Sequence, residues 1–234
     1  MKAWSVGALI ACWLLGPACA AAGEGTKEPL AEPAAHGEPE PAPAADAAPP
    51  SPEEELLAEV NRLRADPPAW AANLRWYRSL FDGSLVRAPG EIALQTQEGP
   101  AAVDEAIRFL ERAEPLPPLR RSPGMSRAAA EHAADLGQSG RTGHAGADGS
   151  QAWDRLNRHG RWQKTSGEVV SFGQRAARRV VIQFLVDDGV PDRGHRKNLF
   201  DPGFAVAGVA CGPHTRYGHC CVITLAGGYE EAER

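Results

Sequence analysis

The order of the apolar patterns places the strongest constraint on what this chain can fold into. Apolar residues first recur at helical spacing, which predicts five helices. These segments are 53–64, 69–80, 100–111, 122–136 and 174–187. Two apolar, β-branched runs follow at 204–211 and 220–225, separated by a turn rich in Gly, Pro and His, and they predict an antiparallel hairpin. Helices followed by a terminal hairpin indicate an α+β layered domain and argue against a repeating βαβ sheet.

Turn-forming residues set the expected helix boundaries. Ser122 followed by Pro123 is a helix-start signal. Gly137 is expected to end that helix, and the Gly- and Ser-rich residues 137–149 are expected to form a loop. Residues 85–95 contain an Ala-Pro-Gly break and predict a short hairpin or an irregular loop.

The first 52 residues are expected to lie outside the folded domain. Residues 1–20 combine Lys2, an apolar stretch and small residues at its end, which is typical of a cleaved secretory signal. An alternative interpretation takes Cys12 as the lipid-modified cysteine of a lipobox. Residues 21–52 are mostly Ala and Pro with six acids and one base, which predicts a disordered acidic linker. The folded domain is then 53–234, in a protein that is secreted, periplasmic or held at the cell surface as an envelope component.

Composition and missing motifs exclude several classes of protein. A formal net charge of −5 leaves no basic surplus, so nucleic acid is not expected as a partner. After the signal, no apolar run is long enough for a transmembrane span. No G-x-S-x-G, H-E-x-x-H, P-loop or G-x-G-x-x-G pattern occurs, which argues against the common hydrolase and nucleotide-binding classes. Ser166 is an alternative nucleophile, although no His or Asp pairing to it is visible in the sequence.

Three cysteines remain after the signal, namely Cys211, Cys220 and Cys221. Export to an oxidising compartment predicts one disulfide, from Cys211 to either Cys220 or Cys221, with one thiol left over. As an alternative, Cys211, His214, His219 and Cys220 could form a zinc cluster, because soft and borderline ligands occur close together.

Titratable side chains gather beside glycines in separate segments. His144, Glu168, Asp187 and His195 could converge on a cation, since imidazole and carboxylate suit zinc and carboxylates suit magnesium or calcium. A His and a carboxylate in one cleft could instead act as general base and acid. Each residue also has a structural interpretation, in which His144 bonds loop backbone, Glu168 caps a helix and Asp187 pairs with an arginine.

Several short motifs occur in the order found in one family. The residues that carry the resemblance are 61–64, 130–133, 143–144, 167–168 and the run 187–198, which includes Gly-His-Arg-Lys-Asn. This order resembles the CAP superfamily, also called SCP, the group of cysteine-rich secretory, antigen 5 and pathogenesis-related 1 proteins. The chain is most similar to bacterial exported members. The core resemblance covers 119–229, and 53–118 reads as an expanded N-terminal helical part.

The resemblance implies a fold and a set of site residues. The fold would be a three-layer α-β-α sandwich with a central, mainly antiparallel sheet. The cleft would hold His144, Glu168, Asp187 and His195, with the two histidines as candidate metal ligands. Asp187 stands where the family has Glu, so its reach is one methylene shorter, and Asp188 is a rival for the same place.

The loop around the second histidine is expected to support the site. Gly194 should let the chain approach the cleft closely. Arg196 and Asn198 should organise the loop through hydrogen bonds.

The function implied by the resemblance is binding rather than catalysis. We expect an exported CAP-domain protein that binds a divalent cation (Zn, Mg or Ca) and a small or lipid-like ligand. One alternative is a metal- or carboxylate-assisted hydrolase in which Glu168, His144 and His195 would be catalytic. A second alternative is a surface interaction module in which these residues are only structural. The lack of a nucleophile motif favours the first interpretation.

Overall fold

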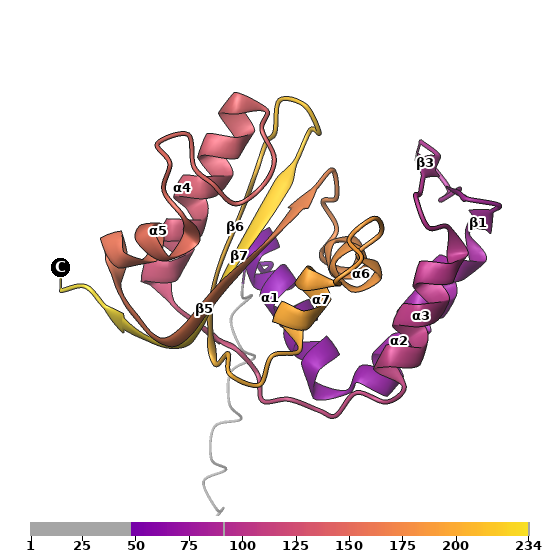
Figure 1. Ribbon diagram of the computed structural model, residues 1–234, viewed down its shortest axis with the longest axis horizontal. Helices are drawn as coiled ribbons and strands as arrows, with labels where there is room; N and C mark the ends of the chain where they lie inside the picture. The colour runs from indigo at the N-terminus through magenta and orange to yellow at the C-terminus, as the bar shows by residue number, and fades with distance from the viewer. Residues whose placement is uncertain (1–47, 91, 234) are drawn as a thin grey trace, which may run out of the picture. The chain divides into compact units, whose positions relative to one another are not determined.

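The computed structural model describes residues 48–90 and 92–233 (Figure 1). The sequence predictions for 1–20, and for nearly all of 21–52, lie outside this part of the chain. Within it, seven helices and two sheets form. In these same residues, no helix is both long and apolar enough to cross a membrane.

Four strands form the central sheet. In spatial order they are β4 (Arg120–Arg121), β6 (Val206–Gly212), β7 (Cys220–Glu231) and β5 (Gly160–Phe172). Strand β7 is antiparallel to both β6 and β5, and β4 is parallel to β6. The predicted terminal hairpin is therefore confirmed as β6 and β7, and the sheet is mainly antiparallel.

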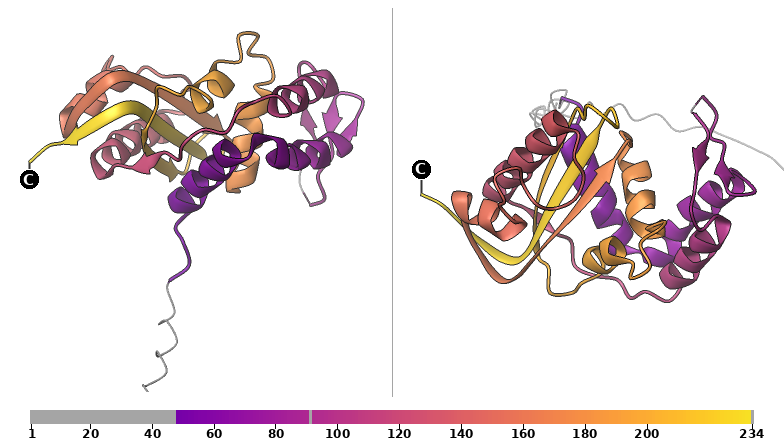
Figure 2. Two further views of the ribbon diagram at one scale, coloured as in Figure 1. Left: turned by 90° about the horizontal axis from the view of Figure 1, so that it is seen from below. Right: turned by 45° about the horizontal axis from the view of Figure 1, so that its top comes forward.

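Helices cover both faces of this sheet (Figures 1 and 2). On one face lie α4 (Pro123–Ser139) and α5 (Ala152–His159), and on the other lie α1 (Pro52–Ala65), α6 (Ala177–Val186) and α7 (Gly194–Leu199). The helices α2 (Pro67–Ser79) and α3 (Pro100–Leu110) pack on each other beside α6. The predicted α+β fold with three layers is thus confirmed.

Alternating strand residues hold the layers together, because successive side chains of a strand point to opposite faces. Val169 of β5 and Ile223 of β7 belong to the apolar cluster under α1 and α6. Their neighbours Val170 and Val222 belong to a second cluster, under α4. Both faces of the sheet are therefore buried.

A buried arginine of α1 makes hydrogen bonds to three later parts of the chain. The side chain of Arg64 donates to the carbonyl oxygens of Pro117, Leu199 and Phe204 at 3.1, 2.7 and 3.3 Å. Pro117 and Phe204 lie in loops and Leu199 ends α7, so one guanidinium fixes two loops and the end of a helix against α1.

The predicted helices all form, with ends that differ by up to three residues; the helix predicted from 174 begins at Ala177. Gly137 does not stop α4: the helix continues to Ser139 and ends at Gly140, which adopts the left-handed conformation at φ 70°. Gly137 is required instead for packing, because a Cβ there would overlap the carbonyl oxygen of Pro213. The prediction that the loop begins at residue 137 was therefore wrong, because the helix continues to Ser139.

Further elements were not predicted from the sequence. These are the helices α5 and α7 and the strand β5, which is the longest strand in the described residues. The segment 85–95 does form a hairpin, since β2 (Leu85–Val86) pairs antiparallel with β3 (Leu94–Gln95), and β1 (Phe81–Asp82) adds to β2. This small sheet continues from α2 and lies near the site described below.

The close packing of α4 on β6 generates a test. Replacing Gly208 by Ala would drive a Cβ into the backbone of Met125 and Ser126, and backbone cannot move aside as a flexible side chain can. We expect Gly208→Ala to lower the free energy of unfolding by about 3 kcal/mol, measured by urea denaturation. Gly212→Ala in the same strand is the control, because a Cβ there meets nothing within 4 Å. Equal stability of the two variants would contradict this packing.

Candidate functional site

Of the four side chains singled out in the sequence, His144, Asp187 and His195 line one cleft, and Glu168 is buried behind His144. His144 comes from the loop after α4, and Glu168 from the middle of β5. Asp187 is the C-cap of α6, and His195 lies in the first turn of α7. Asp187 adopts the left-handed conformation at φ 52°, which Asp tolerates better than most residues and which turns its carboxylate back toward α7.

A buried carboxylate orients the first histidine. Nδ1 of His144 lies 3.0 Å from Oε1 of Glu168. The side chain of Glu168 is 2% exposed, whereas that of His144 is 49% exposed. The exposed imidazole of His144 is therefore held in place by a buried carboxylate.

Arg155 of α5 fixes Glu168 in turn. Its Nη2 atom donates to Oε1 and Oε2 of Glu168 at 3.1 and 2.9 Å, and also to the carbonyl oxygen of His144 at 3.1 Å. Its Nη1 atom donates to the carbonyl oxygen of Ser150 at 2.9 Å. Because both charges are buried and paired, the carboxylate is balanced inside the protein and cannot turn freely toward the cleft.

A second histidine lies behind this pair. His132 of α4 is fully buried, with Nε2 3.0 Å from the carbonyl oxygen of Gly143 and 3.6 Å from Oε1 of Glu168. Burial lowers the pKa of His132 below its ordinary value, although Glu168 acts in the opposite direction. His132 is therefore neutral near pH 7 and supports the loop that carries His144.

The other histidine is held in a similar way. Nδ1 of His195 lies 2.6 Å from Oδ1 of Asp187, and the backbone N–H of His195 donates to Oδ2 at 2.9 Å. Asp188 accepts instead from the backbone N–H groups of Gln97 and Glu98 at 2.7 and 2.8 Å. Both acidic residues line the cavity, and Asp187 is the one that contacts His195.

The two imidazoles face each other across the cleft. The ring centroids of His144 and His195 are 6.3 Å apart. In a neutral ring that donates Nδ1–H to a carboxylate, the lone pair lies on Nε2. Among the described residues, neither Nε2 atom makes a hydrogen bond. Both rings line the same cavity.

The supporting loop is organised by two of its three predicted residues. Arg196 donates to the carbonyl oxygen of Leu185 at 2.6 Å and to both carboxylate oxygens of Glu105 at 2.6 and 2.7 Å. Asn198 makes a longer contact of 3.4 Å to the carbonyl oxygen of Glu168. Gly194 does not approach the cleft closely, because a Cβ there would lie 3.5 Å from Asp192, an ordinary contact.

The close approach occurs at a different glycine. A Cβ on Gly167, next to Glu168 in β5, would come within 2.9 Å of the Phe204 ring and 3.3 Å of Asn198. The expectation for Gly194 was therefore wrong, because the glycine that allows a close approach is Gly167.

Ion pairs join the loop between α6 and α7 to the N-terminal helical part. Arg193 donates to both oxygens of Glu98 at 2.6 and 2.7 Å. Together with the N–H of Gly189, this guanidinium lowers the pKa of Glu98 to about 2. Since the pKa is depressed, the contribution to stability is present above the ordinary Glu pKa and is lost as the pH falls toward 2.

A cavity opens directly beside the two histidines. Its volume is about 380 Å³, and His144, Asp187 and His195 form part of its wall. Apolar side chains from β3, β5, α6 and the following loop form much of the rest, and these are Leu94, Val170, Phe172, Ile182, Phe184, Val186 and Val190. The volume falls in the range of small-molecule sites, and this lining suits an apolar ligand.

The sequence as a whole was compared with known families. The family model of CAP, the cysteine-rich secretory protein family, matches residues 57–225. The chain belongs to the CAP family. The match extends over the N-terminal helical part as well as the core, and it confirms the resemblance noted in the sequence. No curated protein matches the sequence.

Solved structures similar to this CAP domain come from bacteria. An outer surface protein of Borrelia burgdorferi is 19% identical with a TM-score of 0.41, over 50% of this chain and 80% of that one. An extracellular protein containing an SCP domain from Bacillus anthracis is 19% identical with a TM-score of 0.39, over 56% and 39%. A cysteine-rich secretory protein of Staphylococcus aureus is 12% identical with a TM-score of 0.33, over 60% and 44%. At such low identity, the likeness concerns the fold alone.

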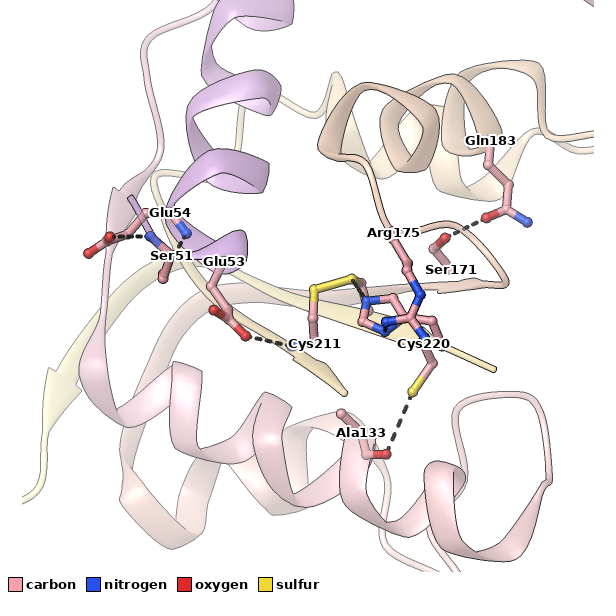
Figure 3. The surroundings of a disulfide bond; sticks show 11 residues. Ser51, Glu53, Glu54, Ala133, Ser171, Arg175, Gln183, Cys211 and Cys220 are labelled. Carbon is pink, nitrogen blue, oxygen red and sulfur yellow. Dashed lines mark hydrogen bonds between the residues drawn. A yellow bond between two sulfur atoms is a disulfide. The ribbon is translucent and has the colours of Figure 1, made fainter. Parts of the chain in front are cut away.

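The CAP domain also contains the predicted disulfide, between Cys211 and Cys221 (Figure 3). Cys220 points to the opposite face of β7, where its thiol lies 3.6 Å from the carbonyl oxygen of Ala133, and burial raises its pKa. His214 is turned away as well and contacts the carbonyl oxygen of Arg141 at 2.9 Å. The predicted cluster of Cys211, His214, His219 and Cys220 is therefore not assembled.

Ser166 does not form a catalytic arrangement. It lies in β5 opposite Ala226, next to an irregularity in the pairing at Gln163. Among the residues that the structure describes, no histidine or carboxylate makes a hydrogen bond with it.

Arg155 and His132 were not predicted as site residues. An arginine in a short amphipathic helix is usually exposed, and nothing local in the sequence marks Arg155 as buried. His132 did stand in the Ala-Glu-His-Ala segment that carried the family resemblance, so position within a motif was the available signal.

The burial of Arg155 gives a testable stability difference. Arg155→Met would leave Glu168 charged, buried and without its main partner, so we expect unfolding to cost about 3–5 kcal/mol less. Arg158→Met is the control in the same helix, since Arg158 is 43% exposed and its solvent-screened pairs should contribute little to stability. Urea denaturation of both variants measures the difference. Similar small losses for both would contradict a structural role of the buried pair.

Proposed function

We propose that this CAP domain binds a divalent cation between His144 and His195 and holds a small, apolar or lipid-like ligand in the adjoining cavity. The proposal depends mainly on one observation: each imidazole contacts a buried carboxylate through Nδ1, and the two ring centroids lie 6.3 Å apart on the wall of one cavity. Carboxylate support of this kind is typical of metal-binding histidines, because it sets the tautomer and the direction of the ring.

The ligand set favours zinc over magnesium or calcium. Imidazole nitrogen suits zinc, whereas magnesium and calcium prefer oxygen ligands. Glu168 and Asp187 would act as outer partners, since their oxygens already accept from histidine nitrogens. Two protein ligands leave further positions for water or for an oxygen of a bound ligand, at about 2.1 Å from the metal.

The cavity beside the rings supports the second half of the proposal. A ligand with an apolar body could pack against the α6 side chains Ile182, Phe184 and Val186. A polar head group on the same ligand would then face His144 and His195. This orientation combines apolar burial with a small number of polar contacts, as in most small-molecule sites.

The hydrolase alternative receives less support from the geometry. Arg155 donates to both oxygens of Glu168, and a carboxylate held in this way is a poor base for water. The surface-module alternative predicts that binding of a partner survives the loss of both cleft histidines. That alternative gives no reason for zinc binding that depends on both histidines, which the titration below measures.

We also propose that the protein acts outside the cytoplasm. The signal pattern of residues 1–20 supports export, and the Cys211–Cys221 disulfide suits an oxidising compartment.

Zinc titration by calorimetry, on the oxidised protein, tests the cation site. His144→Ala and His195→Ala each remove a ligand and should abolish measurable zinc binding. Asp187→Asn keeps a residue that tolerates the left-handed backbone but loses the charged acceptor, so affinity should fall by about 10–100-fold. His159→Ala, at a histidine that pairs with Glu131 outside the cleft, is the control. Unchanged zinc affinity in both cleft variants would refute the proposal.

Displacement of a fluorescent fatty-acid probe tests the cavity. Val190 is partly exposed on the cavity wall, and Val190→Trp would fill part of the space. We expect probe affinity to fall at least about tenfold, or about 1.4 kcal/mol, while zinc binding is kept. Leu116→Trp adds the same bulk at a different cavity, beside α3, and should bind the probe like wild type. Equal probe affinity for all three proteins would show that the ligand lies elsewhere.

A further inference from the structure

A second group of metal-ligating side chains surrounds the disulfide, outside the cleft. Cys211 of β6 and Cys221 of β7 lie directly opposite each other in the register of the two strands, with their Cα atoms 4.1 Å apart. Both sulfur atoms therefore lie on the same face of the sheet. The strand pairing around them, and not the disulfide alone, holds the two side chains together.

A histidine completes a set of three. His219 directly precedes β7, and its Nε2 atom lies 3.6 Å from Sγ of Cys221. Ligand atoms of Cys211, His219 and Cys221 all lie within 4.8 Å of one another. Cys221 is buried and the other two are partly exposed, so small ions and small reductants can reach the group from solvent.

We propose that reduction of the Cys211–Cys221 disulfide converts this group into a site for zinc or another thiophilic divalent cation, with His219 as the third ligand. Two thiolates and one imidazole form a typical zinc set, with bonds of about 2.3 Å to sulfur and about 2.0–2.1 Å to nitrogen. The site is separate from the cleft of His144 and His195 and does not depend on the function proposed for that cleft.

A carboxylate lies beside this group without belonging to it. Oε1 of Glu53, in the first turn of α1, accepts from the backbone N–H of Cys211 at 3.2 Å (Figure 3). This bond ties α1 to β6 next to the cysteine. The fourth position of a bound cation would then be filled by water.

Conversion of the disulfide into a metal site takes two steps, reduction and metal binding. A dithiol reductant supplies two electrons and two protons, the S–S bond breaks, Cys211 and Cys221 become thiols, and the dithiol becomes a cyclic disulfide. The cation then displaces one proton from each thiol as the two sulfur–metal bonds form. His219 binds through Nε2 with its proton on Nδ1, and the exposed Arg175, whose Nη1 lies 3.4 Å from Nδ1, must move aside.

The neighbouring cysteine provides a natural control. Cys220 is next to Cys221 in sequence, but its thiol faces α4 on the other side of the sheet. It can take part neither in the disulfide nor in the proposed site without a flip of the strand.

Cobalt titration followed by absorbance tests the proposal, because thiolate ligands give a charge-transfer band that imidazole and carboxylate ligands do not. The full chain is used with Cys12→Ser and Cys19→Ser, so that the only thiols are those of the folded domain. We expect the thiolate band to saturate at one sulfur-bound cobalt per chain after reduction by a water-soluble phosphine, whatever the cleft binds, and no such band in the oxidised protein. The cleft histidines contain no sulfur, so they cannot produce this signal.

Three variants assign the ligands. Cys221→Ser should remove the band, and His219→Ala should weaken cobalt binding at least tenfold. Cys220→Ser should keep both the band and the affinity. Circular dichroism of the reduced protein monitors the fold.

The outcomes that overturn the proposal are direct. They are the absence of a thiolate band in the reduced wild-type protein, an unchanged affinity in His219→Ala, or loss of the band in Cys220→Ser. Unfolding of the reduced chain would overturn it too, since the site requires intact pairing of β6 and β7.

Discussion

The antiparallel pairing of β5 with β7 is the interaction on which the rest of the structure depends. The two strands pair along nearly their whole length, interrupted by one irregularity between Gln163 and Ser166. This pairing buries apolar side chains on both faces of the sheet, so that α4 packs on one face and α1 and α6 on the other. It also carries Glu168 into the cleft, where the Arg155 guanidinium balances its charge. The position of His144 follows from Glu168, so the cleft depends on strand pairing formed by distant parts of the chain.

The helical part of the fold could be predicted from the sequence, because apolar residues at helical spacing are a local signal. The segments with several large apolar residues on one side all became helices. The strand β5 escaped prediction because its first half is mostly polar apart from Trp162, and its run of apolar residues is limited to the end that is buried. The helix α7 is only 6 residues long, too short for a recognisable repeat. Such elements are formed by tertiary contacts more than by local preference.

The identity of the cleft residues could be proposed from the sequence only through the family resemblance. Spacing alone left open whether His144 and His195 would meet, since they come from a loop and from a helix on the other side of β5. The partners that hold the cleft could not be predicted, because Arg155 and Glu105 look like ordinary surface charges in sequence. Their roles arise from long-range pairing, which places Arg155 on Glu168 and Arg196 on Glu105.

The attachment of Glu98 and Glu105 to Arg193 and Arg196 has a wider consequence. One wall of the cavity belongs to the stretch between α2 and α3, while the histidine pair belongs to the C-terminal core. Insertions, deletions or substitutions in the stretch between α2 and α3 can therefore change which ligand the cavity accepts. His144 and His195 would keep their positions. The four charged side chains join this variable-length wall to the histidine-bearing core, so ligand selectivity could change without any change in the histidine pair.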